Sequence, residues 1–485
     1  MGAGVSSWSL AREVSSLGQL GVVSGTALDS ILVRKLWDGD PGGHMRRAIA
    51  AFPSREIARA VLDRYLREDT SVAVADVASQ GPDGEEQVEE PLPGQRYKLA
   101  PMLRARLTPE RQALIVLANF AEVYLAKEGH DGVVGINYLE KIQFPTLPSL
   151  YGAMLAGVDV VLMGAGIPAE IPAALDRLSQ HLDVSISLDV LEADGEKYEL
   201  GFDPAAVGLG AGVVGAASLR RPKFLPIVSA ATLAKALLRK SPGGIDGFVV
   251  EGPTAGGHNA PPRGQLQLSE RGEPVYGERD VVNLEQMKAL GVPFWLAGEY
   301  GSRQRFEEAV AAGARGVQVG TAFAFCEESG LDPALRRQFL ANLVRGEGDV
   351  ITDPVASPTG FPFKVATLEG TLSEDEAYED RPRLCDLGYL RRAYRRQDGT
   401  LDYRCASEPV ADYVRKGGRA DDTVGRKCLC NALVTNIGLG QRRADGYLEL
   451  PMLTAGDGIN SVMAFITPDR LSYHARDVIE AILPD

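Results

Sequence analysis

The sequence predicts an α/β fold built on a parallel sheet, and two observations support this prediction. From residue 20 to about residue 345, short apolar runs alternate with longer amphipathic runs, and each apolar run ends in a loop of Gly, Asn or Ser. Strand, helix and strand at this spacing indicate parallel strands with crossover helices. The composition, 45% hydrophobic and 24% charged, is that of an ordinary globular protein.

Seven segments have the apolar, β-branched character of buried strands. They are residues 20–24, 133–137, 158–163, 224–228, 248–250, 294–297 and 316–319. Helical patterns lie between them at 150–156, 171–182, 231–239, 282–290 and 303–312. Seven strands that each end in a small-residue loop favour a (β/α)₈ TIM barrel, with an open doubly wound sheet as the structural alternative.

A barrel needs an eighth strand, and the strand that is missing is expected at the N-terminus. Residues 1–7 have the character of a loop that follows a strand, and residues 8–17 that of the next helix. The first barrel strand is therefore apparently missing from this chain and would precede Met1. We favour a true start upstream of Met1 over a barrel that closes in another way.

The length of 485 residues exceeds what one hydrophobic core serves, so a large domain with an appendage is expected. We assign residues 1–345 to the barrel, with a helical insertion at about 38–130, and residues 346–485 to a C-terminal extension. The insertion has helical stretches at 44–51, 57–66 and 111–128.

Two shorter segments interrupt the alternation of strands and helices. Within the insertion, the acidic run Asp69–Gly94 is expected to be a mobile surface loop. Residues 183–203 alternate apolar and polar side chains around Asp194-Gly195, which predicts a β-hairpin with an Asp-Gly turn.

Charge and hydropathy exclude several classes of partner. A net charge of −14 argues against nucleic acid or an anionic membrane surface. No apolar run approaches the roughly 20 residues that span a bilayer. The N-terminus shows no secretory signal pattern, so we expect a cytoplasmic protein. Five cysteines in so long a chain do not predict a disulfide framework.

The most informative motif is Gly256-Gly257-His258, which follows the strand at 248–250. Glycines let backbone N–H groups approach a bound ring or phosphate, and histidine transfers protons most readily near neutral pH. The chain has only five histidines, which narrows the search for the chemistry. The structural alternative is a glycine turn with a solvated histidine.

Two further loops follow the last two strands. They are Ala297-Gly298-Glu299-Tyr300-Gly301 and Val319-Gly320-Thr321-Ala322. In barrels, the loops after strands seven and eight often bind a phosphate through backbone N–H groups and a helix N-terminus. Glycine and threonine used only as turn residues remain the alternative for either loop alone.

These motifs together resemble the flavin-dependent nitronate monooxygenases, formerly called 2-nitropropane dioxygenases, and the related FMN-dependent enoyl-acyl carrier protein reductases. The resemblance covers about residues 1–345. The residues that carry it are Gly2-Ala3-Gly4-Val5-Ser6, Leu10-Ala11, Val14-Ser15, Gly18, Leu20-Gly21, Gly135-Ile136-Asn137, Gly252–His258, Gly298 and Gly320-Thr321.

The resemblance implies FMN at the carboxyl-terminal mouth of the barrel. The FMN phosphate would lie on the backbone of Gly298, Glu299, Gly320 and Thr321, and the ring would contact Asn137, Gly256 and Gly257. His258 would be the catalytic residue, as a base toward a nitroalkane or a hydrogen-bonding partner of a nitronate. Glu299 stands where the family usually has a second glycine, which puts the phosphate geometry in doubt.

Three functions follow from the resemblance as expectations. The first is nitronate monooxygenase-like oxidation of small nitroalkanes or nitronates with O₂. The second is an NAD(P)H-dependent enoyl-thioester reductase, because Gly360–Val365 is also similar to enoyl reductases of fatty acid and polyketide synthesis. The third is a non-catalytic flavin-binding protein. The expected partners are a small-molecule substrate and O₂, with a homo-oligomer or an acyl carrier protein as further alternatives.

Other motifs point to chemistry less directly. Gly210–Gly215 fits G-x-G-x-x-G but follows no convincing strand, and we interpret it as a flexible glycine-rich loop rather than a dinucleotide-binding motif. Four cysteines of the extension leave two readings open, a metal site or separate buried thiols. These are Cys385, Cys405, Cys428 and Cys430. Cys326 is expected in the core. The basic residues nearest the mouth loops, namely Arg221, Lys223 and Lys364, are expected to be solvated surface charges.

Overall fold

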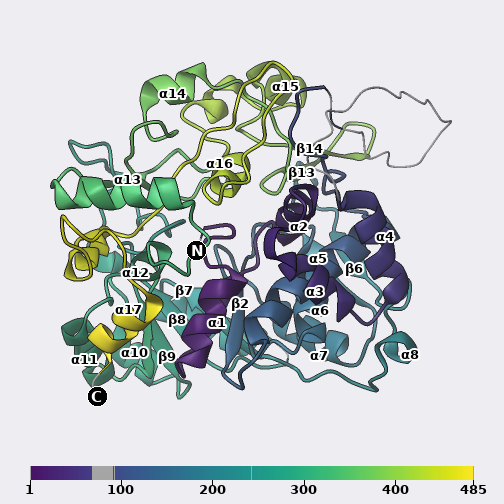
Figure 1. Cartoon of the computed structure of the whole chain (residues 1–485), viewed down its shortest axis with the longest axis horizontal. Coiled ribbons are helices and arrows are strands. Elements are labelled where there is room, and N and C mark those ends of the chain that lie inside the picture. The colour runs from purple at the N-terminus through teal and green to yellow at the C-terminus, as the bar shows by residue number, and fades with distance from the viewer. Residues whose placement is uncertain (1, 68–90, 92, 242, 484–485) are drawn as a thin grey trace.

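A seven-stranded parallel sheet lies at the centre of the computed structural model, which describes residues 2–67, 91, 93–241 and 243–483 (Figure 1). Its strands are β1 (Gly21–Ser24), β2 (Val134–Leu139), β3 (Val160–Gly164), β7 (Lys223–Val228), β8 (Phe248–Glu251), β9 (Phe294–Ala297) and β10 (Gly316–Gln318). Every pair of neighbours is parallel. The seven predicted strands are confirmed, with ends shifted by at most two residues.

The strands lie side by side in their order along the chain. In a doubly wound sheet the strand order reverses at a switch point, so the observed order of the strands favours the barrel. Leu162, Leu225 and Val249 form a small apolar cluster on one face, and Phe248 and Val250 pack on the other. The molecule is thus an α/β protein whose parallel sheet curls into part of a barrel. β1 and β10 are its two edges in the described part of the chain, and the eighth strand stays a prediction.

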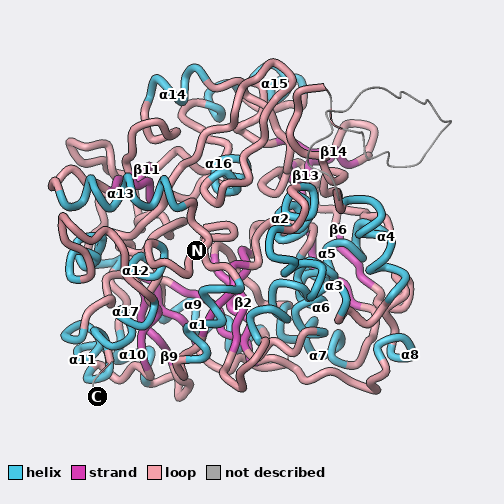
Figure 2. The backbone as a smooth tube through the Cα atoms, in the orientation of Figure 1, coloured by secondary structure: helices cyan, strands magenta, loops and turns pink. Residues whose placement is uncertain are grey.

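Helices that follow the strands cover the outer face of the sheet (Figure 2). They are α6 (Thr146–Leu155), α7 (Ile171–Ser179), α9 (Ala231–Lys240), α10 (Leu284–Lys288) and α11 (Arg303–Ala311), together with α1 (Trp8–Ser16), which precedes β1. The short helix α12 (Thr321–Ala324) directly follows β10 at the carboxyl ends of the strands. Each of these helices contains or overlaps a predicted helix or mouth loop. Outward-facing Val228, Phe294 and Leu296 pack against Leu237 and Met287 of α9 and α10.

The helical insertion lies between β1 and β2. It consists of α2 (Leu28–Trp37), η1 (Pro41–Gly43), α3 (His44–Ala50), α4 (Arg55–Tyr65) and α5 (Pro109–Lys127). Helix α2 was not predicted, since nine of its ten residues are buried and the apolar run shows no amphipathic period. Residues 69–90 and 92 of the acidic run lie outside the described residues.

The predicted hairpin is confirmed as β4 (Val184–Leu188) paired antiparallel with β6 (Tyr198–Phe202). Asp194 and Gly195 have φ angles of 50° and 86°, the left-handed conformation that such turns require. The G-x-G-x-x-G segment forms a short helix, α8 (Ala211–Val214), none of whose residues is buried. The segment is therefore exposed, and it forms one short helical turn where a loop was expected.

The extension lies across one end of the sheet and then returns along its side (Figure 1). Helix α13 (Pro333–Val344) leads into the extension. The elements of the extension are β11 (Val350–Asp353), β12 (Phe363–Ala366), α14 (Asp375–Asp380), β13 (Arg392–Arg395), β14 (Leu401–Arg404), α15 (Val410–Arg415), η3 (Ala420–Thr423), α16 (Leu429–Thr435), η4 (Asp457–Ala464) and α17 (Ala475–Ile482). The short 3-10 helix η2 (Glu278–Asp280) lies earlier in the chain, between β8 and α10. The short strand β5 (Val190–Leu191) joins β13 and β14 in a small sheet. The last helix, α17, packs against α1 and α11.

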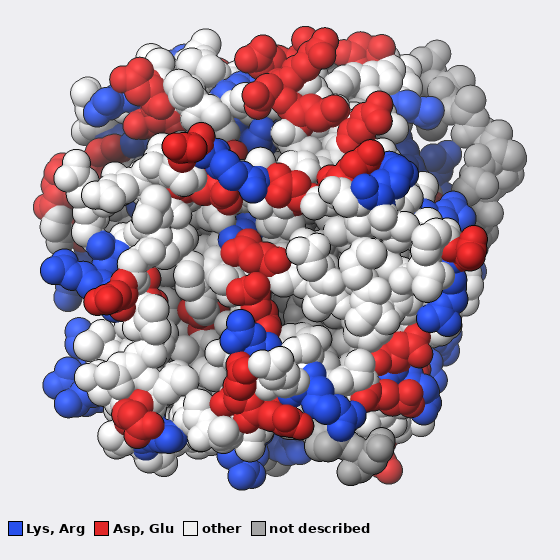
Figure 3. All heavy atoms as spheres, turned by 90° about the vertical axis from the view of Figure 1, so that its left-hand side faces the viewer, with Lys and Arg blue, Asp and Glu red and all other residues white. Residues whose placement is uncertain are grey.

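Charge is mixed over the face shown in Figure 3, where acidic and basic side chains are interspersed and no broad basic patch is visible. None of the helices in the described part of the chain is both long and apolar enough to cross a membrane.

A buried ion pair ties the insertion to the extension. Arg111 of α5 donates to Asp29 of α2, and both side chains are almost fully buried. Tyr389 of the extension donates its hydroxyl to the same carboxylate and hydrogen-bonds Ser30 at 2.7 Å. Removing one partner of such a pair leaves a buried charge without compensation.

We therefore expect Arg111→Ala to lower the free energy of unfolding by about 3–5 kcal/mol. Arg59→Ala is the control, since Arg59 pairs with Asp63 on the surface and such pairs contribute below about 1 kcal/mol. Denaturant unfolding followed by circular dichroism measures both. Equal losses in the two variants would contradict the structural role of the buried pair.

Candidate active site

A cavity of about 470 Å³ occupies the inside of the curled sheet and continues to the carboxyl ends of β8, β9 and β10. Val22, Leu162, Leu225, Val249 and Trp295 form its apolar lower wall. Backbone of β1 and β10, at the two edges of the sheet, also lines it. Ile479 and Ile482 of α17 cover this seam between the edges from outside.

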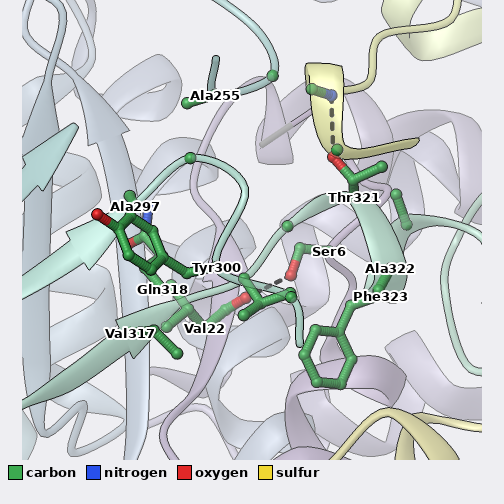
Figure 4. Close-up of a pocket in the computed structure, with 18 of the residues that line it drawn as sticks. Ser6, Val22, Ala255, Ala297, Tyr300, Val317, Gln318, Thr321, Ala322 and Phe323 are labelled. Atoms are coloured by element: carbon green, nitrogen blue, oxygen red, sulfur yellow. Dashed lines mark hydrogen bonds between the residues drawn. The ribbon is translucent and has the colours of Figure 1, made fainter. Parts of the chain in front are cut away.

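Three of the predicted loops meet at the upper wall of the cavity. Gly256, Gly298, Glu299, Gly320 and Thr321 all line it, and Figure 4 shows Ala255, Ala297 and Thr321 arranged around the same space. Asn137, Gly257 and His258 are not on this wall. The Asn137 Oδ1 atom is buried without a hydrogen-bond partner among the described residues. Asn137 is in register with Leu162, a residue of the cavity wall, so its side chain shares the inward face of the sheet.

The extension supplies a wall that sequence reasoning missed. Thr454, Ala455, Gly456, Gly458 and Ser461 line the cavity. The Gly456 N–H donates to Thr321 Oγ1 at 2.9 Å, the contact drawn in Figure 4. The Gly257 N–H donates to Thr454 Oγ1 at 2.9 Å, and the Asp457 N–H to the Thr254 carbonyl at 3.0 Å. The signal available in the sequence was the small-residue run Thr454-Ala455-Gly456-Asp457-Gly458.

His258 lies two residues after Gly256, which is part of the cavity wall. Its side chain is held by residues of the extension. Its Nε2 atom is 2.7 Å from Ser357 Oγ, and its ring meets the Phe363 ring edge to face at 4.9 Å. Ser357 is fully buried, and it hydrogen-bonds Thr359 in turn. Burial lowers the pKa of the His258 imidazole to about 4. At neutral pH the ring is therefore uncharged and has one nitrogen able to accept a proton.

Lys364 is buried, which corrects the expectation of a solvated surface charge. Its ammonium group donates to Thr352 Oγ1 at 2.6 Å and to the carboxylate of Asp457. The backbone N–H of Lys364 donates to the Gly257 carbonyl at 2.9 Å. The expectation failed because the carboxylate that compensates the charge lies 93 positions away in the sequence. Arg221 forms ion pairs with Asp176 and Asp246, and Lys223 is exposed.

Glu299 has a left-handed backbone, with φ at 58°. This conformation suits glycine, the residue that the resemblance expects here. The neighbouring Gly298 has φ at 99°, and a Cβ there would lie 2.7 Å from Thr254 Oγ1. The loop thus keeps the backbone path of a glycine pair although one glycine is replaced.

The four cysteines of the extension are brought near one another without forming a metal site. Hydrogen bonds from Arg383 to Ala406 and from Ser407 to Lys427 join the segments that carry them. Burial raises the pKa of Cys385, Cys405, Cys428 and Cys430, which disfavours thiolates. In the described ranges, no group of three or more His, Cys, Asp or Glu side chains could hold a metal ion. Cys326 is fully buried in the core, as expected.

Glu251 is a further ionisable residue of the wall that sequence reasoning missed. It ends β8 and lines the cavity. Burial raises the pKa of Glu251 to about 7. The available signal was a carboxylate that ends an otherwise apolar strand.

The curled parallel sheet and its cavity define a barrel-like α/β protein with a small-molecule site at the carboxyl ends of the strands. Residues 212–351 match the family model described as nitronate monooxygenase, and they include His258 and both glycine loops. Through these residues the chain is similar to the nitronate monooxygenase family of oxidoreductases.

Two curated relatives match parts of the chain. A probable nitronate monooxygenase of Bacillus subtilis is 35% identical over 114 residues, 24% of this chain and 31% of that protein. A (3aS,4S,5R,7aS)-5-hydroxy-7a-methyl-1-oxo-octahydro-1H-indene-4-carboxyl-CoA dehydrogenase of Mycobacterium tuberculosis is 27% identical over 234 residues. That alignment covers 45% of this chain and 60% of the relative, so the chain spans less than two thirds of either.

Solved structures show more distant similarity. Nitroalkane oxidase from Streptomyces ansochromogenes aligns with a TM-score of 0.41 at 14% identity, over 99% of this chain and 92% of that one. FabK from Thermotoga maritima aligns with a TM-score of 0.39 at 15% identity, over 78% and 80%.

The residues of the cavity fit the FMN that this family typically uses. The volume lies in the range of cofactor sites, roughly 300–1,000 Å³. Glycines expose backbone N–H groups at its upper wall, and Thr321 accepts a hydrogen bond from Gly456 while keeping its own O–H to donate. The buried, unpartnered Asn137 Oδ1 atom is available to a ligand. Glu251 and Glu299 oppose the phosphate charge, so binding would depend on backbone donors.

We expect Glu299→Gly to raise the free energy of unfolding by about 1 kcal/mol, because a left-handed backbone costs a non-glycine residue about that much. The matched control is Glu307→Gly in the middle of α11, where the same exchange should lower stability by about 1 kcal/mol. Denaturant unfolding of both proteins gives the comparison. Destabilisation by Glu299→Gly would show that the side chain, rather than the backbone, matters at this position.

Proposed function

We propose that the protein is an FMN-dependent oxidoreductase that oxidises small nitroalkanes or nitronates with O₂. The observation that carries the proposal is the family match over residues 212–351. These residues include the glycine loops that line the cavity and His258, which lies two residues after the wall residue Gly256. The cofactor, when bound, would accept electrons from the substrate and pass them to oxygen. The protein would position the substrate, exclude water from the site and transfer a proton.

His258 would act on the proton of the substrate. With its Nε2 atom at Ser357, the Nδ1 atom forms no hydrogen bond to another described residue and is the atom available. As a neutral base, it can accept the α-proton of a nitroalkane; toward a nitronate anion, an imidazole N–H would donate instead. Ser357 and Phe363 fix the ring, so the extension orients the residue that the barrel carries.

His258→Gln should lower nitroalkane turnover by about 10²–10⁴-fold while FMN remains bound. His474→Gln is the control, since His474 is an exposed histidine that pairs with Glu328. Oxygen uptake with a nitroalkane substrate measures turnover, and flavin absorbance measures occupancy. Since the imidazole is neutral above a pKa of about 4, its contribution should be constant from pH 6 to 8 and be lost as pH falls toward 4. Unchanged oxygen uptake in His258→Gln would remove the proposed role.

A second candidate function is NAD(P)H-dependent reduction of an enoyl thioester, with acyl carrier protein or coenzyme A as the carrier. It is favoured by the Mycobacterium tuberculosis relative, whose name includes a CoA thioester. The apolar lower wall of the cavity would suit an acyl chain.

Anaerobic mixing with NADPH separates the two candidates. A reductase should lose its flavin absorbance near 450 nm within seconds, roughly the time of one turnover, whereas an enzyme that takes electrons only from nitro compounds should keep it. Nitroethane added anaerobically is the complementary arm. Bleaching by neither reagent would defeat both functions and leave a non-catalytic flavin-binding protein.

A further inference from the structure

Glu251 projects into the cavity from the same layer of the sheet as two other wall residues. In the strand register, Glu251 of β8 lies opposite Ala297 of β9, and Ala297 lies opposite Gln318 of β10. All three line the cavity, and Figure 4 shows Ala297 and Gln318 at its wall. The two polar side chains therefore flank a methyl group, with their Cα atoms roughly 10 Å apart across two interstrand spacings.

Neither polar side chain has a hydrogen-bonding partner among the described residues. Within the described residues, Glu251 forms no hydrogen bond or ion pair, and the Gln318 amide forms no hydrogen bond. A buried polar group without a partner costs free energy, and a carboxyl group costs more when it is ionised. Such groups persist in a fold where a ligand completes their hydrogen bonds.

The pair fits a planar ring whose edge alternates carbonyl acceptors with an N–H donor, as the pyrimidine edge of a flavin does. Gln318 can donate and accept, and a neutral carboxylic acid can do the same. The small Ala297 side chain leaves space for the ring edge between them. This argument rests on the proposed function, because it takes FMN as the ligand.

We propose that Glu251 is the proton-exchanging residue of the cavity: it hydrogen-bonds the polar ring edge of bound FMN as a neutral acid, so that binding of FMN takes up one proton. Two effects set this direction. The ring displaces water from the carboxyl group, and the phosphate adds negative charge to the same cavity; both disfavour the carboxylate. In the free protein, burial already raises the pKa of Glu251 to about 7, so a large fraction is ionised just above neutrality.

Other ionisable groups near the cavity behave differently in this pH range. His258 has a pKa lowered by burial to about 4, and burial raises the pKa of Tyr300 above its usual value, so neither titrates between pH 7 and 8.5. Charged side chains of the surrounding described elements include Glu299, Arg315, Lys364 and Asp457, and the charge of the chain's terminal amino group acts on both Glu251 and His258. Lys364 and Asp457 compensate each other. Glu299 is the group that needs a control.

The test measures FMN affinity by quenching of flavin fluorescence from pH 7 to 8.5. The second phosphate ionisation of FMN lies near pH 6 and does not contribute there. Wild-type Kd should rise by about tenfold over this range, since the free carboxylate must be protonated on binding. Glu251→Gln keeps a donor and removes the proton equilibrium, so its Kd should stay constant. Glu299→Gln should keep the wild-type pH dependence.

Calorimetry of the wild type gives a second readout that needs no variant. FMN titrated at pH 7.5 in two buffers of different ionisation enthalpy should show uptake of a large fraction of one proton. A flat wild-type Kd with no proton uptake, or a pH dependence that persists in Glu251→Gln, would overturn the role of Glu251. Loss of the pH dependence in Glu299→Gln would show that Glu299, rather than Glu251, is the residue that takes up the proton. Absence of FMN binding at every pH would instead defeat the proposed function.

Discussion

The structure depends on the close approach of two loops that carry no side chain at their contact. A Cβ on Gly456 would lie 2.7 Å from the Thr254 carbonyl, and one on Gly256 would lie 3.0 Å from Ala455 and Gly456. Because both positions are glycine, the extension can lie against the loop after β8 and donate from Gly456 to Thr321. The upper wall of the cavity depends on this contact, and Asp457, the partner of Lys364, lies directly beside it.

The strands could be predicted from the sequence because each forms a short apolar run between small-residue loops, so local pattern and tertiary role agree. Helix α2 could not, since burial on nearly all sides removes the period that marks a helix. For the site, the Gly256-Gly257-His258 loop and the two glycine loops were recognisable. Thr454–Gly458 and Ser357 were not, because they join the site through contacts about 100 to 200 positions distant in the chain.

The polar chemistry of the cavity is divided between barrel and extension. The barrel supplies Glu251, Gln318 and the backbone of the glycine loops, whereas the extension supplies Ser357 and Phe363 behind His258. The two ionisable groups are shifted in opposite senses by the same cause, burial, which favours the neutral form of each. A site in which burial disfavours the carboxylate form of Glu251 can bind a dianionic cofactor through backbone dipoles with less repulsion.

Helix α17 lines the cavity at the seam of the sheet and rests on α1, which lies hundreds of residues earlier in the chain. During synthesis, α1 leaves the ribosome hundreds of residues before its cover does. The inner apolar wall is then open to water and to other chains until α17 has been synthesised. Closure of the cavity therefore waits for α17, and deletion of residues 475–482 should leave the inner apolar wall exposed.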